Sequence, residues 1–376
     1  MAARSFCIPV TAPDGLTKAL AAVRAEVSSP SAGLVFVSGA LAQELEGVAE
    51  QVKAAWRNVP VTVVPAAGVL TERGEIEGAS AVSGILWSGG KPAPFVIAEG
   101  GPPSALREAL GSIAGQKSAT ALVFAKSDLE PESLEGISAV APNLCVFGAG
   151  TVGGAALTLT ATGEVLRGRA SGLVLLGMAA PLVESSPACR LVTAMRPIEE
   201  VASGLVLGLG GSPALDVLSS CLPDLKNAGT QAQPQPVVFV ALADPASPER
   251  FVVRPVRGID PGRRGVMVGP EAKHGMLLGF AVRDAGASRS GLEAAARSIS
   301  QAALGSAPRF ALFLSCAGRG QGLYGALDVE SRILRQRFGD LPIAGMHSAF
   351  EIVPWGRGEA RIALYTGVLA LFRSPS

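Results

Sequence analysis

The order of the elements that this sequence predicts constrains its fold more than any other feature. A short apolar strand, a helix, a second strand, a glycine-containing turn and a closing strand follow one another within residues 33–87, and the same order returns within 120–177 and 309–372. Strands alternating with helices indicate sheets and helices packed in layers. We therefore predict an α/β fold of layered mixed sheets, built from repeated strand-helix-strand-hairpin units. Chance alternation without internal duplication is the other interpretation.

A region of different character separates the second and third copies of this pattern. It contains the glycine-rich stretch 207–211 and a predicted meander of short strands over 251–282. A chain of 376 residues has room for two domains at roughly 150 residues each. We place the boundary near residue 184, which gives domains at 1–184 and 185–376.

Charge and histidine content exclude several classes of function. Lys and Arg total 32 and Asp and Glu total 31, so the net charge is +1, and the excess of basic residues that marks a nucleic-acid-binding surface is missing. The two histidines form no H-x-x-x-H pattern, which argues against a zinc hydrolase. We expect no nucleic-acid partner, no metal and no cofactor.

The cysteines and the apolar stretches indicate where the protein resides. Its five cysteines are scattered and never spaced C-x-x-C, which is typical of reduced thiols in a cytosol. The first residues have no apolar stretch of the kind that forms a secretory signal, and we find no segment suited to crossing a membrane. The sequence predicts a cytoplasmic protein without a membrane partner.

The stretch from Ser315 to Gly325, which reads SCAGRGQGLYG, is the sharpest local motif. It follows a predicted strand and opens a helix, a place where backbone N–H groups bind anions well. Arg319 lies within it and could add a bidentate contact. The next strand ends in Met-His-Ser rather than in an acidic residue, so a dinucleotide site is not expected. A small polar ligand and a purely structural turn remain as the two interpretations.

Single residues around this motif allow more than one function. Cys316 is placed at a strand end beside an arginine and a helix start, features that activate a thiol, although a cysteine in a strand is commonly just buried. His347 follows a strand and could face a ligand, serve as an axial haem ligand or be a hydrogen-bonded structural residue. The glutamates at 72, 75 and 77 are expected on a solvated hairpin tip.

Two further arginines are candidate ligand contacts. Arg254 lies within an apolar predicted strand between Val253 and Pro255, so its side chain is expected to face a specific partner. Arg283 stands at a strand end, and pairing with Asp284 is the alternative there.

Several motifs together resemble the FIST family of small-ligand sensory proteins. They include FVVRPVRGIDP from Phe251, FLSCAGRG from Phe313, EIVP from Glu351, and GVLTERGEIEG from Gly68. The resemblance implies a FIST N domain followed by a FIST C domain that senses small ligands, amino acids among them, and signals to a separate partner protein. Some members of the family are linked to haem and nitric oxide sensing, so the resemblance implies this function as an alternative.

From the motif and the resemblance together we expect a non-catalytic sensory protein that binds a small polar or anionic ligand in its C-terminal half. The alternatives are a cysteine-dependent enzyme using Cys316, a haem or nitric oxide sensor, and a protein-interaction scaffold. The expected ligand-binding residues are Cys316, Gly318, Arg319, Gly320, Gly322, Tyr324, Arg254, Arg283 and His347.

Overall fold

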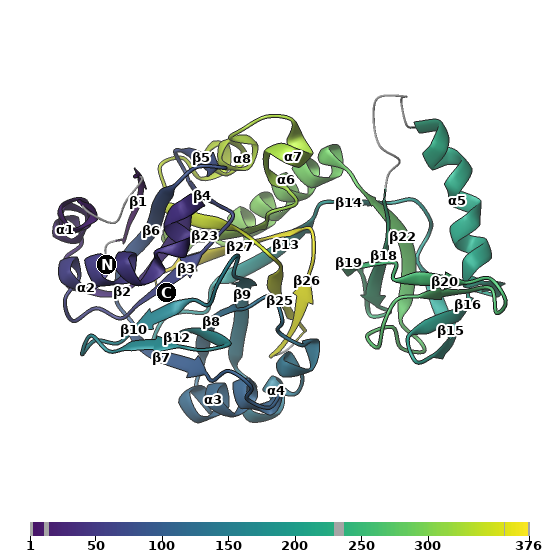
Figure 1. Ribbon diagram of the computed structural model, residues 1–376, viewed down its shortest axis with the longest axis horizontal. Coiled ribbons are helices and arrows are strands. Elements are labelled where there is room, and N and C mark those ends of the chain that lie inside the picture. Colours follow the sequence, from purple (N-terminus) through teal and green to yellow (C-terminus); the bar gives the residue numbers. More distant parts are fainter. Residues whose placement is uncertain (1–2, 11–14, 229–236, 357, 375–376) are drawn as a thin grey trace. The chain divides into compact units, whose positions relative to one another are not determined.

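A computed structural model describes residues 3–10, 15–228, 237–356 and 358–374 (Figure 1). The chain forms two compact units. The first unit takes in residues 1–186, 289–362 and 366–376, and the second takes in residues 187–288 and 363–365. The second unit is therefore inserted into the sequence of the first. The sequence-based boundary at residue 184 stays a prediction.

Three six-stranded sheets with one common arrangement make up the first unit. Two parallel strands, joined through a helix, lie side by side within each sheet, and each such pair defines one module. The parallel pairs of the first, second and third modules are β2 (Pro30–Ser38) with β3 (Val61–Pro65), β8 (Ala119–Ala125) with β9 (Leu144–Gly150), and β23 (Pro308–Cys316) with β24 (Ile343–Ser348). The predicted mixed α/β fold with repeated units is confirmed.

A helix and two flanking strands complete each module in the same way. The connecting helices are α2 (Leu45–Ala55), α4 (Ile137–Val140) and α8 (Val329–Phe338). An antiparallel strand lies beside the first parallel strand of each module: β6 (Ala81–Ser88), β12 (Ala170–Leu176) and β27 (Thr366–Arg373). The outer strands are β1 (Ala3–Pro9), β7 (Lys91–Ile97) and β13 (Leu182–Pro187).

Each module passes a hairpin to another module. The hairpin of β4 (Gly68–Thr71) and β5 (Gly74–Glu77) follows β3 in sequence but pairs with β24. The hairpin of β10 (Leu157–Leu159) and β11 (Val165–Arg167) follows β9 but pairs with β3. The hairpin of β25 (Glu351–Trp355) and β26 (Glu359–Ala363) follows β24 but pairs with β9. The exchange is cyclic, and it brings residues 68–77 against the third module.

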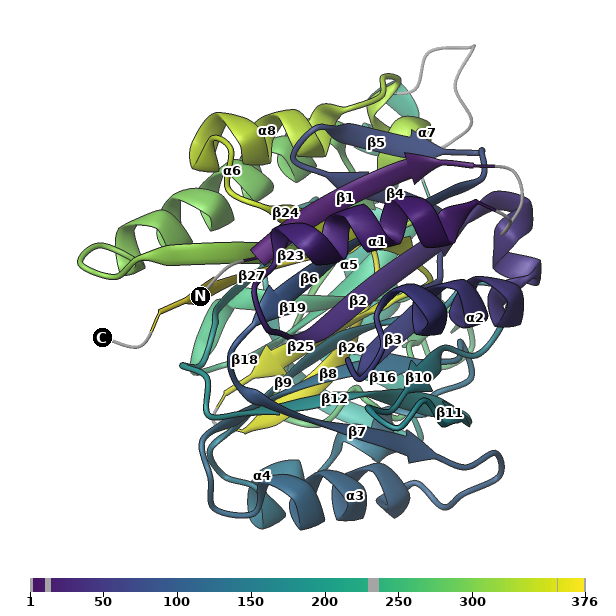
Figure 2. The ribbon, with the colours of Figure 1, turned by 90° about the vertical axis from the view of Figure 1, so that its left-hand side faces the viewer.

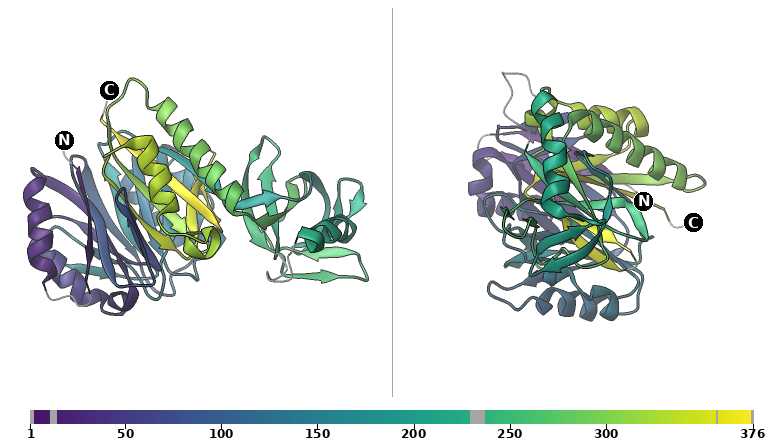
Figure 3. Two further views of the ribbon diagram at one scale, coloured as in Figure 1. Left: turned by 90° about the horizontal axis from the view of Figure 1, so that it is seen from above. Right: turned by 90° about the vertical axis from the view of Figure 1, so that its right-hand side faces the viewer.

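Aromatic side chains join the three sheets in one core. Trp87 of β6 stacks on Phe310 of β23 with ring centroids 5.3 Å apart, and Phe36 of β2 meets Phe124 of β8 edge to face at 6.1 Å. Such pairs add to the free energy gained from burying apolar area. The outer face of the first sheet is covered by α2 and by α1 (Leu16–Glu26), which lie next to each other in Figures 2 and 3.

The second unit is built on a nine-stranded sheet and α5 (Ala214–Ala228). Its strands are β14 (Cys189–Leu191), β15 (Arg196–Ala202), β16 (Leu205–Leu209), β17 (Ser212–Pro213), β18 (Val238–Asp244), β19 (Ser247–Pro255), β20 (Gly258–Asp260), β21 (Gly265–Met267) and β22 (Leu277–Arg283). The ring of Tyr365 packs on that of Phe239 in its core, with centroids 4.8 Å apart.

The other helical segments of the described chain are the 3-10 turns Gly39–Gln43 and Pro131–Leu134, α3 (Ser104–Ala114), α6 (Ala285–Ala302) and the short α7 (Gly320–Tyr324). Among the helices that the structure describes, none combines the length and the apolar character needed to cross a bilayer.

Candidate functional site

The glycine-rich motif forms a tight turn at the carboxyl end of β23. The backbone N–H of Arg319 donates to the carbonyl oxygen of Cys316 at 2.8 Å, which closes the turn. The short helix α7 (Gly320–Tyr324) follows and ends at Gly325, whose φ of +68° is a left-handed conformation that suits glycine. The carboxyl ends of parallel strands are where α/β sheets commonly bind ligands, so this edge of the third module is the candidate site.

Arg319 is fully buried and bound to acceptors of the protein itself. Its Nε donates to Oε1 of Glu330 in α8 at 2.6 Å, and its Nη1 donates to the carbonyl oxygen of Ser186. Neither Arg319 nor Glu330 is exposed (0%), and Nη2 of Arg319 has no hydrogen-bond partner in the described parts of the chain. Helix α8 and the end of β13 thus enclose this guanidinium, and the predicted ligand contact of Arg319 stays a prediction.

Glu330 is the centre of this buried network. Its carboxylate also accepts hydrogen bonds from Ser315 Oγ at 2.6 Å and from the Tyr324 hydroxyl at 2.9 Å. Burial alone would raise the pKa of Glu330, but the Arg319 charge, the nearby His347 and the hydrogen bonds from Ser315 and Arg319 outweigh burial and hold the pKa below its ordinary value. Tyr324, an expected ligand contact, is thus a buried partner of Glu330.

A second buried carboxyl group lies near the ends of the same strands. Glu351 accepts hydrogen bonds from Ser348 Oγ at 2.6 Å and from the backbone N–H of Thr366 at 3.2 Å. Burial raises its pKa well above the ordinary value. The residue-by-residue reasoning missed both Glu330 and Glu351. Only Glu351 had a sequence signal, since it opens the Glu-Ile-Val-Pro motif.

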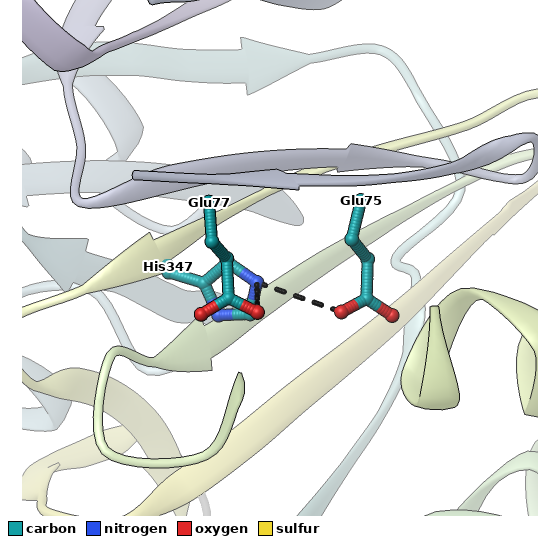
Figure 4. Close-up of side chains that lie close together, drawn as sticks. All are labelled: Glu75, Glu77 and His347. Carbon is teal, nitrogen blue, oxygen red and sulfur yellow. Dashed lines mark ion pairs between the residues drawn. The ribbon is translucent and has the colours of Figure 1, made fainter. Parts of the chain in front are cut away.

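The β4–β5 hairpin places two glutamates beside His347 (Figure 4). Nε2 of His347 lies 3.8 Å from Oε2 of Glu75 and 3.9 Å from Oε1 of Glu77. The expectation that Glu72, Glu75 and Glu77 share a solvated hairpin tip is wrong for Glu72 and Glu75, which are buried. The reason is the hairpin exchange, which docks β4 and β5 on β24 and α8.

The glycines of the motif differ in what surrounds them. A Cβ added at Gly320 would overlap the carboxylate of Glu77, whereas the same atom at Gly322 would meet nothing within 4 Å. The backbone N–H of Gln321 donates to Oε1 of Glu77 at 2.9 Å, so the start of α7 is fixed to the hairpin. Gly318 lies in the turn before α7. Ligand contact by these glycines stays a prediction.

Cys316 and His347 have surroundings that bear on the alternative functions. Cys316 is 5% exposed, and a nucleophilic thiol needs access to solvent, so its burial does not favour the enzyme hypothesis. A haem on His347 does not fit, because Nε2 faces two carboxylates rather than an open apolar slot, and its Cδ2 packs against Gly68.

Arg254 and Arg283 belong to the second unit. Arg254 is buried, and its Nε and Nη2 both donate to the carboxylate of Glu271. Arg283 is exposed at the end of β22 and lies over the ring of Tyr365, 5.3 Å from the ring centroid. Their predicted ligand contacts stay predictions, and the structure gives each arginine a partner within its own unit.

A cavity in the first unit gathers charged side chains of both signs. It has a volume of about 500 Å³ and lies between β1, the β4–β5 turn and the end of α8. We call it the arginine-lined cavity; its lining residues are Arg4, Ser5, Glu72, Arg73, Arg335, Asp340 and Pro342. Glu72 is held there by Ser5 Oγ at 2.8 Å and by the backbone N–H of Ile343 at 3.0 Å. Sequence reasoning missed this cavity, because its residues come from distant segments.

Comparisons with known proteins give a family but no activity. The FIST N domain model matches residues 31–212 and the FIST C domain model matches residues 214–354. An uncharacterized protein of Mycobacterium tuberculosis is 28% identical over 192 residues, which cover 50% of this chain and 49% of that protein. An uncharacterized protein of Mycobacterium bovis is 31% identical over 179 residues, 45% of this chain and 44% of that protein.

The chain thus spans about half the length of the curated relatives it matches. The two family models, in contrast, cover most of its length, in the order that the motifs indicated. This chain belongs to the FIST family, whose domains are described as small-ligand sensory domains of signalling proteins.

Proposed function

We propose that this protein is a cytoplasmic, non-catalytic sensor that binds a small polar or anionic ligand, such as an amino acid, and signals to a separate partner protein. The arginine-lined cavity is the observation that supports this best. It combines three guanidinium groups, from Arg4, Arg73 and Arg335, with the carboxylates of Glu72 and Asp340. Guanidinium groups suit a ligand carboxylate, and a carboxylate suits a ligand ammonium group.

The three arginines that line the cavity differ in the ion pairs that hold their side chains. Arg4 has an ion pair with Glu26 at 2.9 Å, and Arg73 has one with Glu72 at 3.4 Å. Arg335 is exposed on α8. The Arg4–Glu26 pair is exposed on both sides, and such pairs contribute little free energy, so an incoming carboxylate can replace Glu26 at low cost. Arg73 is exposed although its partner Glu72 is buried.

Helix α8 connects the cavity with the glycine-rich turn. It carries Arg335 at the cavity and Glu330, which binds Arg319 of the turn. In this proposal Arg319 positions the turn and does not touch the ligand. A ligand that shifts α8 would change how the turn is held, and a partner protein could detect that change.

The experiment has two steps. Native mass spectrometry of the purified chain looks for a co-purified small molecule, and calorimetric titrations then use L-glutamate, L-lysine and L-leucine. We expect L-glutamate to bind, and Arg335→Glu to weaken that binding at least tenfold, a loss of about 1.4 kcal/mol.

The matched control is Arg332→Glu, a charge reversal at an exposed position of the same helix that does not line the cavity. It should bind L-glutamate like the wild type. Equal losses in both variants, or binding of none of the three amino acids below about 1 mM together with no co-purified molecule, would overturn the proposal.

A further inference from the structure

We propose that Glu75, Glu77 and His347 form a binding site for one divalent metal ion of the zinc type. One side-chain atom from each residue, Oε2, Oε1 and Nε2 respectively, would bind the ion, and a water or small ligand would take the remaining position. A histidine with two carboxylates is a donor set that suits such ions. This inference is independent of the proposed ligand site.

The three donor atoms are spaced for one ion. They all lie within 4.8 Å of one another, and Nε2 is 3.8 Å and 3.9 Å from the two carboxylate oxygens. Bonds of about 2.1 Å in a tetrahedral arrangement put donor atoms about 3.4 Å apart. Shifts of up to about 1 Å in the two glutamate side chains would therefore complete the site.

His347 supplies a second, independent observation. Its side chain is 1% exposed, and neither ring nitrogen has a hydrogen-bond partner among the residues that the structure describes. A buried polar group without a partner costs free energy, about 1–3 kcal/mol. Figure 4 shows the ring turned toward the two carboxylates. A cation bound at Nε2 would satisfy the nitrogen that faces them.

Hydrogen bonds from the backbone already orient both carboxylates. Oε1 of Glu75 accepts from the N–H of Ser331 at 2.8 Å, which leaves Oε2 facing the histidine. Oε1 of Glu77 accepts from the N–H of Gln321 at 2.9 Å, and its second lone pair would bind the ion. Supporting contacts of this kind hold metal ligands in position.

The other two modules serve as internal comparisons. Each hairpin has a glycine in its turn: Gly74, Gly163 and Gly358. The residue six positions before this hairpin glycine pairs with the neighbouring strand in all three modules: Gly68 with His347, Leu157 with Val63, and Ile352 with Gly148. The residue directly after that glycine is a glutamate in all three: Glu75, Glu164 and Glu359. The residue two positions further on is Glu77, Leu166 and Arg361 respectively.

The hairpin glutamate is thus common to the modules, whereas the histidine and second carboxylate occur together only at Glu77 and His347 among these equivalent positions. A role in hairpin docking explains the first residue. It does not explain why one module has a buried histidine where the others have Val63 and Gly148, together with a second acid where the others have Leu166 and Arg361.

The carboxyl groups around His347 and the partial exposure of Glu77 favour binding of a cation at this site. Glu75, Glu77 and Glu330 place three carboxyl groups on the elements around His347, and Arg319, which pairs with Glu330, is the permanent cation among these groups. The side chain of Glu77 is 20% exposed, which gives an ion a route from solvent.

The test uses the full, untagged chain, stripped with EDTA and dialysed, and then titrated with Zn²⁺ against a chromophoric chelator. We expect one Zn²⁺ per chain with a Kd below about 1 µM. Co²⁺ should give a visible absorption band that Zn²⁺ abolishes. Failure of the folded wild type to bind Zn²⁺ in this range would overturn the proposal.

Three variants locate the ion. His347→Asn and Glu77→Gln should each weaken Zn²⁺ binding at least about 100-fold, because even outer contacts of a metal site are worth 10-fold to 100-fold. Glu164→Gln, at the position equivalent to Glu75 in another module, should bind like the wild type. Wild-type affinity in Glu77→Gln, or equal loss in Glu164→Gln, would refute the assignment; Glu77 is partly exposed, so its variant is expected to fold.

Discussion

Arg319 and Glu330 meet at 2.6 Å, Nε to Oε1, with neither side chain exposed to solvent. The pair joins the turn after β23 to the first turn of α8, two segments that are close in sequence and frame the same sheet edge. The serine and tyrosine hydroxyls on Glu330 complete its hydrogen bonding. The glycine-rich motif, whose sequence is typical of an anion-binding turn, is therefore stabilised by buried contacts within the protein.

Removing the Arg319 side chain should destabilise the fold. In Arg319→Ala, Glu330 keeps a buried charge without its counter-ion, a change that costs about 3–5 kcal/mol. The measurement is the free energy of unfolding in urea. Arg167→Ala is the control, because its ion pair with Glu46 is exposed and should be worth less than about 1 kcal/mol. Equal losses in the two variants would contradict the buried-pair account.

Two glycines of the motif should respond differently to alanine. Gly320→Ala places a Cβ on the Glu77 carboxylate and should break its bond to the Gln321 N–H, whereas Gly322→Ala enters open space. We expect Gly320→Ala to lose about 1 kcal/mol and Gly322→Ala to be neutral or slightly stabilising. Hydrogen exchange of the Gln321 amide is the direct readout, and unchanged exchange in Gly320→Ala would refute this geometry.

The thiols should react slowly in the native protein. Burial raises the pKa of Cys145 to about 11, and burial together with Glu72 raises the pKa of Cys7, so both are protonated at neutral pH. Cys189, Cys221 and Cys316 are buried. Labelling with a thiol reagent at pH 7.4 should be fast only after unfolding. Rapid labelling of native Cys316, located by mass spectrometry, would restore the cysteine-enzyme hypothesis.

Asp284 should make stability depend on pH. The N–H of Ala287 donates to its Oδ1 at 2.7 Å at the start of α6 and, with smaller contributions from Arg190, lowers its pKa. The charged form therefore stabilises the fold above the unfolded pKa of about 3.9, and this contribution is lost as pH falls through the folded pKa.

Asp284→Asn keeps a capping side chain and should flatten the stability curve below about pH 4. Asp284→Ala should lose about 1 kcal/mol at pH 7 as well. An unchanged acid slope in Asp284→Asn would show that this carboxylate does not carry the effect.

The sequence predicted the strands and helices of the modules because their periodicity is local. Leu45, Val48 and Val52, for example, follow helical spacing in the sequence and are buried on one face of α2. The pairing of a strand with a strand of another module could not be predicted from such local periodicity. Nothing near Gly68 indicates that β4 pairs with β24, so the burial of Glu72 and Glu75 was missed.

Arg319 shows a second limit of local reasoning. The glycines around it predicted a turn correctly, but whether its guanidinium faces solvent depends on Glu330 and on the Ser186 carbonyl, which the motif does not contain. The repeated Gly-Glu of the hairpins, as at Gly163 and Glu164, is a signal in the sequence that could have related the three hairpins to one another.

Because the hairpins are exchanged cyclically, each six-stranded sheet needs strands from two modules. A chain cut after residue 288 would lose the third module, leaving β4 paired with β5 alone and β9 with an open edge. Bare strand edges invite association with other chains. The three modules should therefore assemble in concert, as mutually dependent parts of one folding event, whatever the order in which the ribosome delivers them.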